Sequence, residues 1–413
     1  GWECREHRLQ SIRTRHTFGG RAILGAVNAT ARVTPPLDEV KGLTTPSLLL
    51  DEARMLQNSQ RLRRHLDGLG VALRPHLKTV KSVDAARRLL TGGDGPAAVS
   101  TLKEAQEFAN AGVRDILYAV GIGPAKLPRV LEIRRSGCDL TIILDSLEQA
   151  MAVAQASRDS GDAIPVLIEI DSDGHRSGLD PDSPDVVGIG RALEEGGAQL
   201  RGVMTHAGES YHAVGPEALT RFAERERDAA VAAAEKLRDA GLPAPVVSVG
   251  STPTAHFARD LSGVTEVRAG VYPFFDLVMA GIGVCGLDEI AISVLTAVIG
   301  HQQEQGWIMI DAGWMALSRD RGTASQAVDQ GYGVVCDING EVIPDLIVTA
   351  TSQEHGVISL REGSSAELPE LPIGTLLRIL PNHACATASQ FDQYEVFPAG
   401  AGGLQQWPRF RGW

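Results

Sequence analysis

The feature that most constrains how this 413-residue chain folds is a regular alternation of short apolar runs with amphipathic segments. Eight runs rich in β-branched residues follow one another: 71–78, 98–101, 115–119, 140–145, 165–171, 200–206, 246–250 and 265–270. The segments between them, such as 146–160 and 216–240, are rich in alanine and arginine and have a helical apolar period. Eight strands, each followed by a helix, predict an α/β chain built on a (β/α)8 barrel of the TIM type.

The last third of the chain has a different pattern. Beyond about residue 285 the helical period disappears, and strand-like runs are separated by Gly, Asn and Pro; these runs are 291–300, 306–311, 331–337, 341–351 and 374–381. The dipeptide Asn339-Gly340 between two of them is a strong hairpin signal. We therefore predict a barrel over 45–285, with a leading strand at 45–51 outside the count of eight, and an all-β domain over 286–413.

Residues 1–44 differ from both parts. The first 34 residues carry six arginines, no lysine and two acidic residues. This composition favours a poorly ordered arm, and the alternative is an arginine-rich targeting segment. Neither interpretation bears on chemistry.

Composition excludes several classes of function. The net charge of −12 removes the electrostatic basis of sequence-independent nucleic-acid binding and of attraction to anionic membranes. Five scattered cysteines argue against a disulfide framework and fit a reducing compartment. No apolar run approaches the roughly 18 residues that a membrane span needs, and no signal-peptide-like segment opens the chain. We expect a cytoplasmic protein whose partner is a small molecule.

The reactive side chains of the predicted barrel fall where its strands end, which is where active sites of such barrels lie. Lys78 ends the first predicted strand, and a lysine is rarely buried unless it is paired or reactive. A desolvated amine can form a Schiff base. The alternative is a salt bridge with Asp171 or Asp173 at the barrel mouth.

A phosphate-binding turn is predicted opposite this lysine. After the seventh strand, Gly250-Ser251-Thr252 enters a helix, and exposed N–H groups with two hydroxyls can hold a phosphate there. An ordinary helix N-cap explains the same residues. Gly270-Val271 forms a companion turn after the eighth strand. A lysine opposite a phosphate cradle fits pyridoxal phosphate, which is linked through its aldehyde and anchored by its phosphate.

A second candidate site lies at 381–385, Pro-Asn-His-Ala-Cys. If this segment is a strand, His383 and Cys385 point to the same face. Imidazole and thiolate suit Zn²⁺, and two protein ligands leave positions open for water and substrate. A core cysteine beside a turn histidine is the alternative.

Five motifs taken together carry a resemblance to a known family. They are Arg74-Pro-His76-Leu-Lys78, Asp173-Gly-His-Arg176-Ser-Gly178, Thr205-His206-Ala-Gly208, Gly250-Ser251-Thr252-Pro-Thr254 and Pro381-Asn-His383-Ala-Cys385. With them, residues 45–413 resemble the D-serine dehydratase and D-threonine aldolase family, which comprises pyridoxal-phosphate enzymes of the alanine-racemase fold. The stretches 99–105, 311–322 and 411–413 are most similar to the branch that acts on D-threo-3-hydroxyaspartate. Many members carry histidine two residues after the lysine, and Val80 at that position also favours this branch.

The resemblance implies a set of site residues. Lys78 matches the lysine that forms the Schiff base. Cofactor contacts are implied at Tyr211, Thr252, Gly270 and Val271, with Arg176 close by, and Ser251 joins them through the phosphate turn. His383 and Cys385 match a metal-ligand pair, for which zinc is expected and manganese or magnesium are alternatives. A homodimer is implied as well.

Together these expectations describe a lyase that removes water from a D-3-hydroxy amino acid, 3-hydroxyaspartate or D-serine, and yields a 2-oxo acid and ammonia. Hydroxide is a poor leaving group, so the metal is expected to act on the leaving oxygen. Arg319 or Arg321 is a candidate for holding a second substrate carboxylate, with solvation at the surface as the alternative. The nearest competing activity is an aldolase that gives glycine and an aldehyde. A racemase has no need of the His-X-Cys pair, and a non-catalytic cofactor-binding protein needs no metal.

Overall fold

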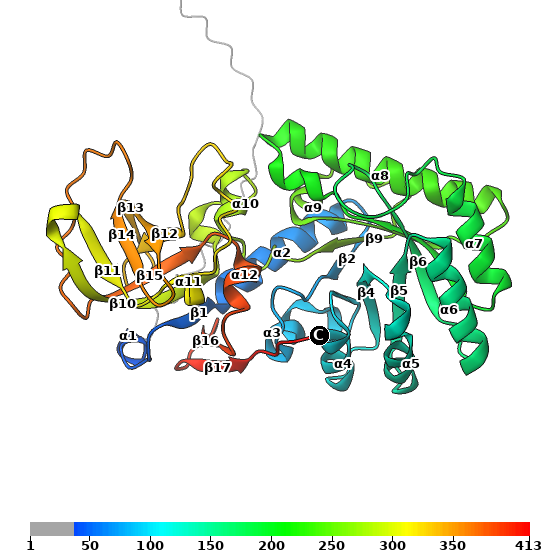
Figure 1. Ribbon diagram of the computed structural model, residues 1–413, viewed down its shortest axis with the longest axis horizontal. Helices are drawn as coiled ribbons and strands as arrows, with labels where there is room; N and C mark the ends of the chain where they lie inside the picture. The colour runs from blue at the N-terminus through cyan, green and yellow to red at the C-terminus, as the bar shows by residue number, and fades with distance from the viewer. Residues whose placement is uncertain (1–36) are drawn as a thin grey trace, which may run out of the picture. The chain divides into compact units, whose positions relative to one another are not determined.

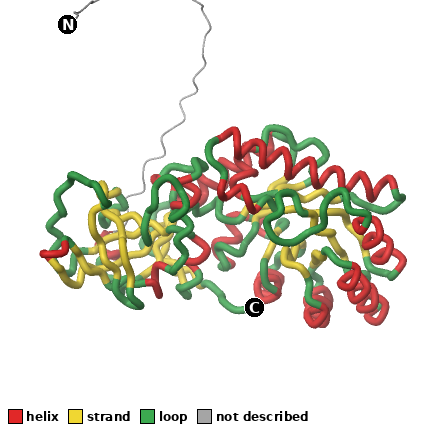
Figure 2. Tube along the Cα trace, turned by 45° about the horizontal axis from the view of Figure 1, so that its top comes forward, coloured by secondary structure: helices red, strands yellow, loops and turns green. Residues whose placement is uncertain are grey.

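The computed structural model describes residues 37–413, which lie in one compact unit. Most of the predicted N-terminal arm, residues 1–36, therefore lies outside the described residues. The first described element is a short helix, α1 (Leu37–Val40), whose Val40 side chain is buried. Two sheets organise the described chain, and helices surround one of them (Figures 1 and 2).

Eight parallel strands form the first sheet, in the order β2-β9-β8-β7-β6-β5-β4-β3. A bridge between His76 and Ala98 joins its two ends, and the N–H of Leu77 donates to the carbonyl of Ala98 at 2.8 Å, so the sheet closes into a barrel. The strands are β2 (Ala72–Pro75), β3 (Ala97–Val99), β4 (Asp115–Gly121), β5 (Asp139–Leu144), β6 (Pro165–Ile170), β7 (Gln199–Thr205), β8 (Val246–Val249) and β9 (Glu266–Ala269). The predicted (β/α)8 barrel is confirmed.

Helices alternate with these strands and surround the barrel (Figure 1). They are α2 (Glu52–Gly68), α3 (Val83–Leu89), α4 (Leu102–Asn110), α5 (Leu127–Arg135), α6 (Leu147–Ser160), α7 (Asp185–Glu195), α8 (Pro216–Asp239) and α9 (Thr252–Phe257), and the short α10 (Leu277–Gly281) follows the last barrel strand. Short 3₁₀ turns lie at Thr91–Gly93, Pro124–Lys126, Gly208–His212, Leu287–Glu289 and Gln303–Gln305. Across residues 37–413, no helix combines the length and the apolar character that crossing a membrane requires.

The barrel strands form because both of their faces are buried, as the continuous apolar runs predict. All six residues of β6 are buried. Neighbouring side chains from five successive strands make one compact row that is separate from the main core; they are Ala98, Leu117, Ile143, Leu167 and Met204. Such a row is the filled interior of a barrel, and the main core packs between the strands and the outer helices.

The second sheet has nine strands in the order β11-β14-β13-β12-β15-β10-β1-β16-β17. They are β1 (Ser47–Asp51), β10 (Ile292–Gln302), β11 (Trp307–Ile310), β12 (Gly333–Cys336), β13 (Val342–Thr351), β14 (Gly356–Leu360), β15 (Leu376–Pro381), β16 (Gln393–Phe397) and β17 (Gln405–Pro408). Two short helices, α11 (Trp314–Leu317) and α12 (Ala384–Ala388), lie in its connections. The predicted β domain after the barrel is confirmed, and Asn339-Gly340 lies in the turn between the antiparallel strands β12 and β13.

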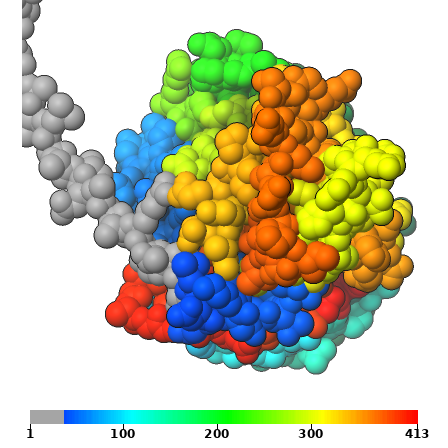
Figure 3. Space-filling model, turned by 90° about the vertical axis from the view of Figure 1, so that its left-hand side faces the viewer, coloured from blue at the N-terminus to red at the C-terminus, as the bar shows by residue number. Residues whose placement is uncertain are grey.

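The strand β1 belongs to this second sheet although it precedes the barrel in the sequence. It pairs antiparallel with β10 and parallel with β16, so α2 leads from one sheet into the other. The helix α1 also contacts the segment just before β17, because the N–H of Leu404 donates to Glu39 at 2.6 Å. In the space-filling view the blue N-terminal residues lie next to the red C-terminal residues (Figure 3).

Candidate active site

A cavity of about 660 Å³ is formed where residues following the barrel strands meet residues of the β domain. All nine candidate residues from the sequence line it: Lys78, Arg176, Tyr211, Ser251, Thr252, Gly270, Val271, His383 and Cys385. The structure therefore brings together residues that are spread over more than 300 positions of the chain.

The two arginines that were candidates for holding a second substrate carboxylate lie outside the cavity lining. Neither Arg319 nor Arg321 is among the residues that line the cavity. The guanidinium of Arg319 stacks on Trp314, 4.2 Å from the ring centroid. Arg321 forms an ion pair with Asp329 at 2.5 Å. Both guanidiniums therefore make their contacts outside the cavity lining.

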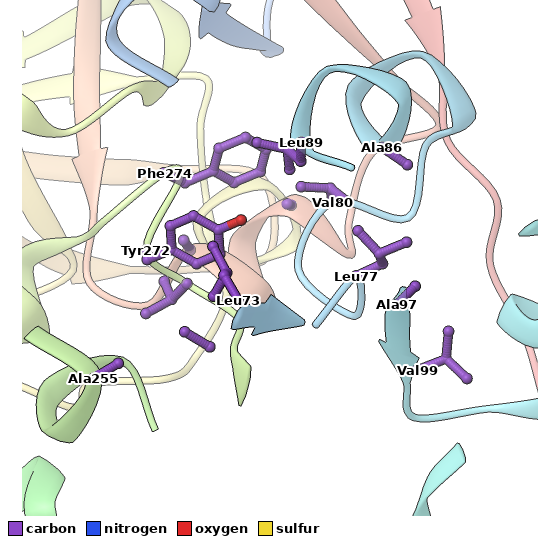
Figure 4. Packing of buried hydrophobic residues seen from close by; sticks show 14 of the residues in the cluster. Leu73, Leu77, Val80, Ala86, Leu89, Ala97, Val99, Ala255, Tyr272 and Phe274 are labelled. Carbon is purple, nitrogen blue, oxygen red and sulfur yellow. The ribbon is translucent and has the colours of Figure 1, made fainter. Parts of the chain in front are cut away.

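Lys78 lies in the turn that follows β2, because the strand ends earlier than predicted, at Pro75. Leu77 and Val80, on either side of it, are buried in the main core and anchor the turn (Figure 4). Within residues 37–413 the ε-amine of Lys78 forms no ion pair or hydrogen bond. The lysine therefore lines the cavity with an unpaired amine.

The proposed alternative for Lys78, a salt bridge at the barrel mouth, is not formed. The Asp171 carboxylate accepts the N–H groups of Asp173 and Gly174. The Asp173 carboxylate accepts the N–H of Glu209 at 2.9 Å. Both carboxylates therefore shape the loop after β6 and leave the lysine amine free to react.

The Gly250-Ser251-Thr252 turn lies between β8 and α9. Ser251 caps α9 through its side chain, so the N-cap interpretation is correct for this residue. The hydroxyl of Thr252 is buried and forms no hydrogen bond of normal geometry, although the Tyr211 phenol lies close enough to interact with it. A buried hydroxyl that forms no hydrogen bond of normal geometry, on the wall of a cavity, is a group that a bound ligand can satisfy. This turn therefore fits the phosphate of pyridoxal phosphate.

A buried glutamate holds this turn in place. Glu226, on α8, accepts the N–H groups of Ala207 at 3.0 Å and Gly250 at 2.8 Å, and the hydroxyl of Thr254 at 2.8 Å. These three groups come from the ends of β7 and β8 and from α9. The carboxylate thus fixes three segments of the cavity wall relative to one another.

The barrel end of the cavity contains a cation, Arg268, that the sequence did not single out, and two neutral imidazoles, His76 and His206, which belong to motifs of the sequence but had no role assigned. Arg268, on β9, is almost fully buried and donates to the Ser248 hydroxyl and the Thr205 carbonyl. Burial, together with the nearby Lys78, lowers the pKa of His76 well below its usual value and that of His206 to about 3. The sequence did contain a signal for Arg268: it is a charged residue within a run predicted to be buried, and such a residue needs a partner or a function.

His383 and Cys385 line the same cavity and shift each other's pKa. Burial works against the charged form of His383, but the Cys385 thiolate and Asp320 outweigh it and raise the His383 pKa to about 11. Burial likewise opposes the Cys385 thiolate, and the charge of His383 overcomes it, so the pKa of Cys385 is lowered. The thiolate is the form of cysteine that binds metals. The pair therefore fits a divalent metal ion.

The local geometry of this pair differs from the prediction. The strand β15 ends at Pro381, and Cys385 lies in the first turn of α12, with His383 as the residue before the helix. The prediction that both residues lie on a strand is therefore wrong, although the helix start still directs both side chains into the cavity.

Asp320 and Asp276 support this corner of the cavity. The Nδ1 atom of His383 lies 2.6 Å from Asp320, which leaves the other ring nitrogen for a ligand. The buried Asp276 accepts the N–H of Ala384 at 2.9 Å and so fixes the start of α12. Within residues 37–413 no set of three or more His, Cys, Asp and Glu side chains is arranged as a metal-binding group. Two protein ligands would leave positions open for water and substrate.

Comparisons with known proteins agree with this arrangement. The family model described as "Alanine racemase, N-terminal domain" matches residues 50–277, and the model described as "Putative serine dehydratase domain" matches residues 291–397. The chain therefore belongs to the fold type III pyridoxal-phosphate enzymes, in the D-serine dehydratase-like family, and the resemblance is confirmed.

Within this family, the chain is similar to several characterised enzymes and solved structures. The chain is 54% identical over 379 residues to the D-threo-3-hydroxyaspartate dehydratase of Delftia sp. (strain HT23), an alignment that covers 91% of this chain and 100% of that protein. The solved structure of the Delftia sp. HT23 enzyme has a TM-score of 0.88 at 53% identity and covers 91% of this chain and 99% of that chain. D-threonine aldolase from Filomicrobium marinum has a TM-score of 0.74 at 27% identity, covering 92% and 98%.

Proposed function

We propose that this protein is a pyridoxal-phosphate- and metal-dependent lyase that removes water from a D-3-hydroxy amino acid, with D-threo-3-hydroxyaspartate as its main substrate. The observation that carries the proposal is the shared cavity: an unpaired lysine amine and a thiolate–imidazole pair line the same 660 Å³ space. The 54% identity to a D-threo-3-hydroxyaspartate dehydratase supports the choice of substrate.

The cofactor would be held by residues of the barrel. Lys78 would provide the amine that links it, and Tyr211, Ser251, Thr252, Gly270 and Val271 would surround its phosphate, with Arg176 nearby. When bound, pyridoxal phosphate supplies an electron sink for the negative charge that develops at Cα. The chain's own part is then to take the Cα proton, and Lys78 is the proposed base.

A divalent metal would be held by His383 and Cys385, and zinc suits this pair of donors best. When bound, it supplies the Lewis acidity that the loss of a hydroxyl group needs. Two related solved structures support the assignment: they are variants of D-threo-3-hydroxyaspartate dehydratase in which a histidine and a cysteine, two positions apart, are replaced by alanine, and the cysteine variant is in the metal-free form. The same spacing separates His383 from Cys385.

The overall reaction balances without a further reactant. Loss of water across Cα and Cβ leaves an enamine, and hydrolysis of that enamine returns one water and releases ammonia. D-threo-3-hydroxyaspartate would give oxaloacetate and D-serine would give pyruvate. We further propose a cytoplasmic homodimer. The family resemblance supports the dimer, and the sparse cysteines, of which the four in the described residues are free, support the compartment.

The test is a product assay with purified protein. D-threo-3-hydroxyaspartate, D-serine and D-threonine are each incubated with the protein, with and without a chelator, and ammonia, 2-oxo acid and glycine are measured. We expect ammonia and 2-oxo acid in equal amounts, fastest from 3-hydroxyaspartate, and loss of both with the chelator. Glycine without ammonia would instead establish an aldolase.

A further inference from the structure

One side chain of the C-terminal tail, Arg409, contacts two of the segments that carry cavity residues. This residue directly follows β17, is only 8% exposed, and donates its N–H to the carbonyl of Asp392 at 2.7 Å. The next residue, Phe410, donates its N–H to the carbonyl of Lys81 at 3.0 Å and packs edge-on against Phe108. The backbone is therefore fixed on both sides of the Arg409 guanidinium.

The guanidinium donates to carbonyls of two segments that are far apart in the sequence. Nε donates to the carbonyl of Val80 at 3.2 Å, and Nη2 donates to that of Thr79 at 3.5 Å. Nη1 donates to the carbonyls of Ala388 and Phe391, the latter at 2.9 Å. The first two carbonyls follow Lys78 in its turn. Of the other two, Ala388 is the last residue of α12, the helix that contains Cys385, and Phe391 lies shortly after that helix.

The chemistry of these contacts requires an arginine. A guanidinium is a rigid planar fork with five donors, whereas a lysine ammonium is a point charge on a flexible stem. A cation also suits the C-terminal end of a helix, where carbonyls lack partners. Tyr394 completes the contact: its ring centroid lies 5.2 Å from the guanidinium, and its hydroxyl donates to the Val80 carbonyl at 2.7 Å.

Each of the two segments is also anchored separately. The Lys78 turn is held by the buried side chains of Leu77 and Val80. The helix α12 is held by the buried Ala384 and Ala388 and by the hydrogen bond from Ala384 to Asp276. Loss of the Arg409 contacts would therefore leave both segments folded and change how they are placed relative to each other.

We propose that Arg409 is a positioning residue that fixes the Lys78 turn and the His383–Cys385 helix relative to each other, so that both act on one substrate molecule. The inference rests on the proposed function, because the relative position of the Lys78 amine and the His383–Cys385 pair matters only if one reaction uses both. It predicts that replacing Arg409 lowers the rate of only that step which needs both the lysine and the metal-binding pair.

The test compares Arg409→Met and Arg409→Lys with a matched control, Arg411→Met, on the same tail. Arg411 is exposed and pairs with Asp392 at the surface. Two rates are measured on the holoenzymes: exchange of the Cα hydrogen of D-alanine with deuterated water, which requires only the lysine and the cofactor, and ammonia release from D-threo-3-hydroxyaspartate, which also requires the metal. Zinc content and the cofactor absorbance band are recorded for each variant.

For Arg409→Met we expect ammonia release to fall about 100-fold while exchange on D-alanine changes by no more than about threefold, because a shift of about 1 Å is enough to disrupt a reaction geometry. Arg409→Lys should fall between the wild type and Arg409→Met, and Arg411→Met should stay within about twofold of the wild type. An equal fall in both rates, or no fall in either, would overturn the inference.

A measurement without turnover separates this inference from the proposed function. In metal-free protein, the rate at which iodoacetamide alkylates Cys385 reports on its hydrogen bond with Thr79, which lies in the Lys78 turn. We expect this rate to change in Arg409→Met and not in Arg411→Met; an unchanged rate in both would contradict the positioning role. If wild-type protein releases no ammonia, the proposed function fails whatever the variants do.

Discussion

The hydroxyl of Thr79 lies 3.1 Å from the sulfur of Cys385, although 306 positions separate the two residues in the sequence. Thr79 follows Lys78 directly, and Cys385 belongs to the thiolate–imidazole pair. This contact joins the barrel to the β domain at the point where both contribute to the cavity. A lysine amine and a metal-binding pair so connected can reach the same small molecule.

Replacement of the lysine tests the cofactor link. Lys78→Ala should abolish the absorbance band of the bound cofactor and lower turnover by roughly 10³-fold or more, because the variant lacks both the linking amine and the base. The control is Lys103→Ala, which removes a lysine that pairs with Glu107 on α4 outside the cavity. An absorbance band and turnover that survive in Lys78→Ala would remove the lysine from the mechanism.

Replacement of the cysteine tests the metal site. Cys385→Ala should lose bound metal and water elimination but keep the cofactor band, because the lysine and the phosphate turn remain. The matched control is Cys285→Ala, since the Cys285 thiol is partly buried and burial raises its pKa. Metal content is measured together with ammonia release. Full activity in Cys385→Ala, or in chelator-treated protein, would show that the reaction proceeds without this site.

The backbone of the phosphate turn depends on a glycine. Gly250 has a φ of 137°, and a Cβ atom there would lie 2.0 Å from the carbonyl oxygen of Arg268. Gly250→Ala should therefore lower the free energy of unfolding by about 3 kcal/mol or more and weaken cofactor binding, because strain and a backbone clash combine. Gly241→Ala is the control, because Gly241 also has a positive φ, 76°, with no atom within 4 Å of the added Cβ. Its cost should be about 1 kcal/mol. Equal effects in the two variants, measured by urea unfolding, would contradict the clash.

A buried histidine gives the stability a defined pH dependence. Burial lowers the pKa of His256 to about 3, against a weaker opposing effect of its hydrogen bond to the Thr252 carbonyl. The unfolded chain has a histidine pKa of about 6.5 and so binds the extra proton between these two values. The free energy of unfolding should therefore fall as the pH drops from about 6.5 towards 3.

The measurement is urea unfolding at pH 7 and pH 5 for the wild type and His256→Gln. The wild type should lose up to about 1.4 kcal/mol per pH unit more than the variant over this window, the contribution of one proton. Identical pH dependence in the two proteins would show that His256 is not held in its neutral form.

Local periodicity predicts the barrel well because each strand and helix is long enough to show its own pattern. The runs at 140–145 and 165–171 appear as β5 and β6, and the segment 146–160 appears as α6, each with bounds within one residue. The strand at 45–51 is also present, but nothing in its sequence reveals that its partners are β10 and β16, because pairing over such separations depends on tertiary structure.

The candidate site shows the same limits. The motifs identify Lys78 and the pair His383 and Cys385, since reactive residue types at strand ends are visible in the sequence. The five-residue helix α12 is too short to show a helical period, so the segment looked like a strand. Arg268 lies in a run predicted to be buried, but its partners lie in distant segments and gave it no role. Arg409 could not be assigned because both its partners and its burial follow from the fold alone.

The most direct test of the central claim is a crystal structure of the holoenzyme in which the metal is located by anomalous scattering. We predict one metal bound to the Cys385 sulfur at about 2.3 Å and to a His383 ring nitrogen at about 2.0–2.1 Å, as for zinc, facing a cofactor attached to Lys78 across the same cavity. A metal bound elsewhere, or separated from the cofactor by protein, would contradict the account.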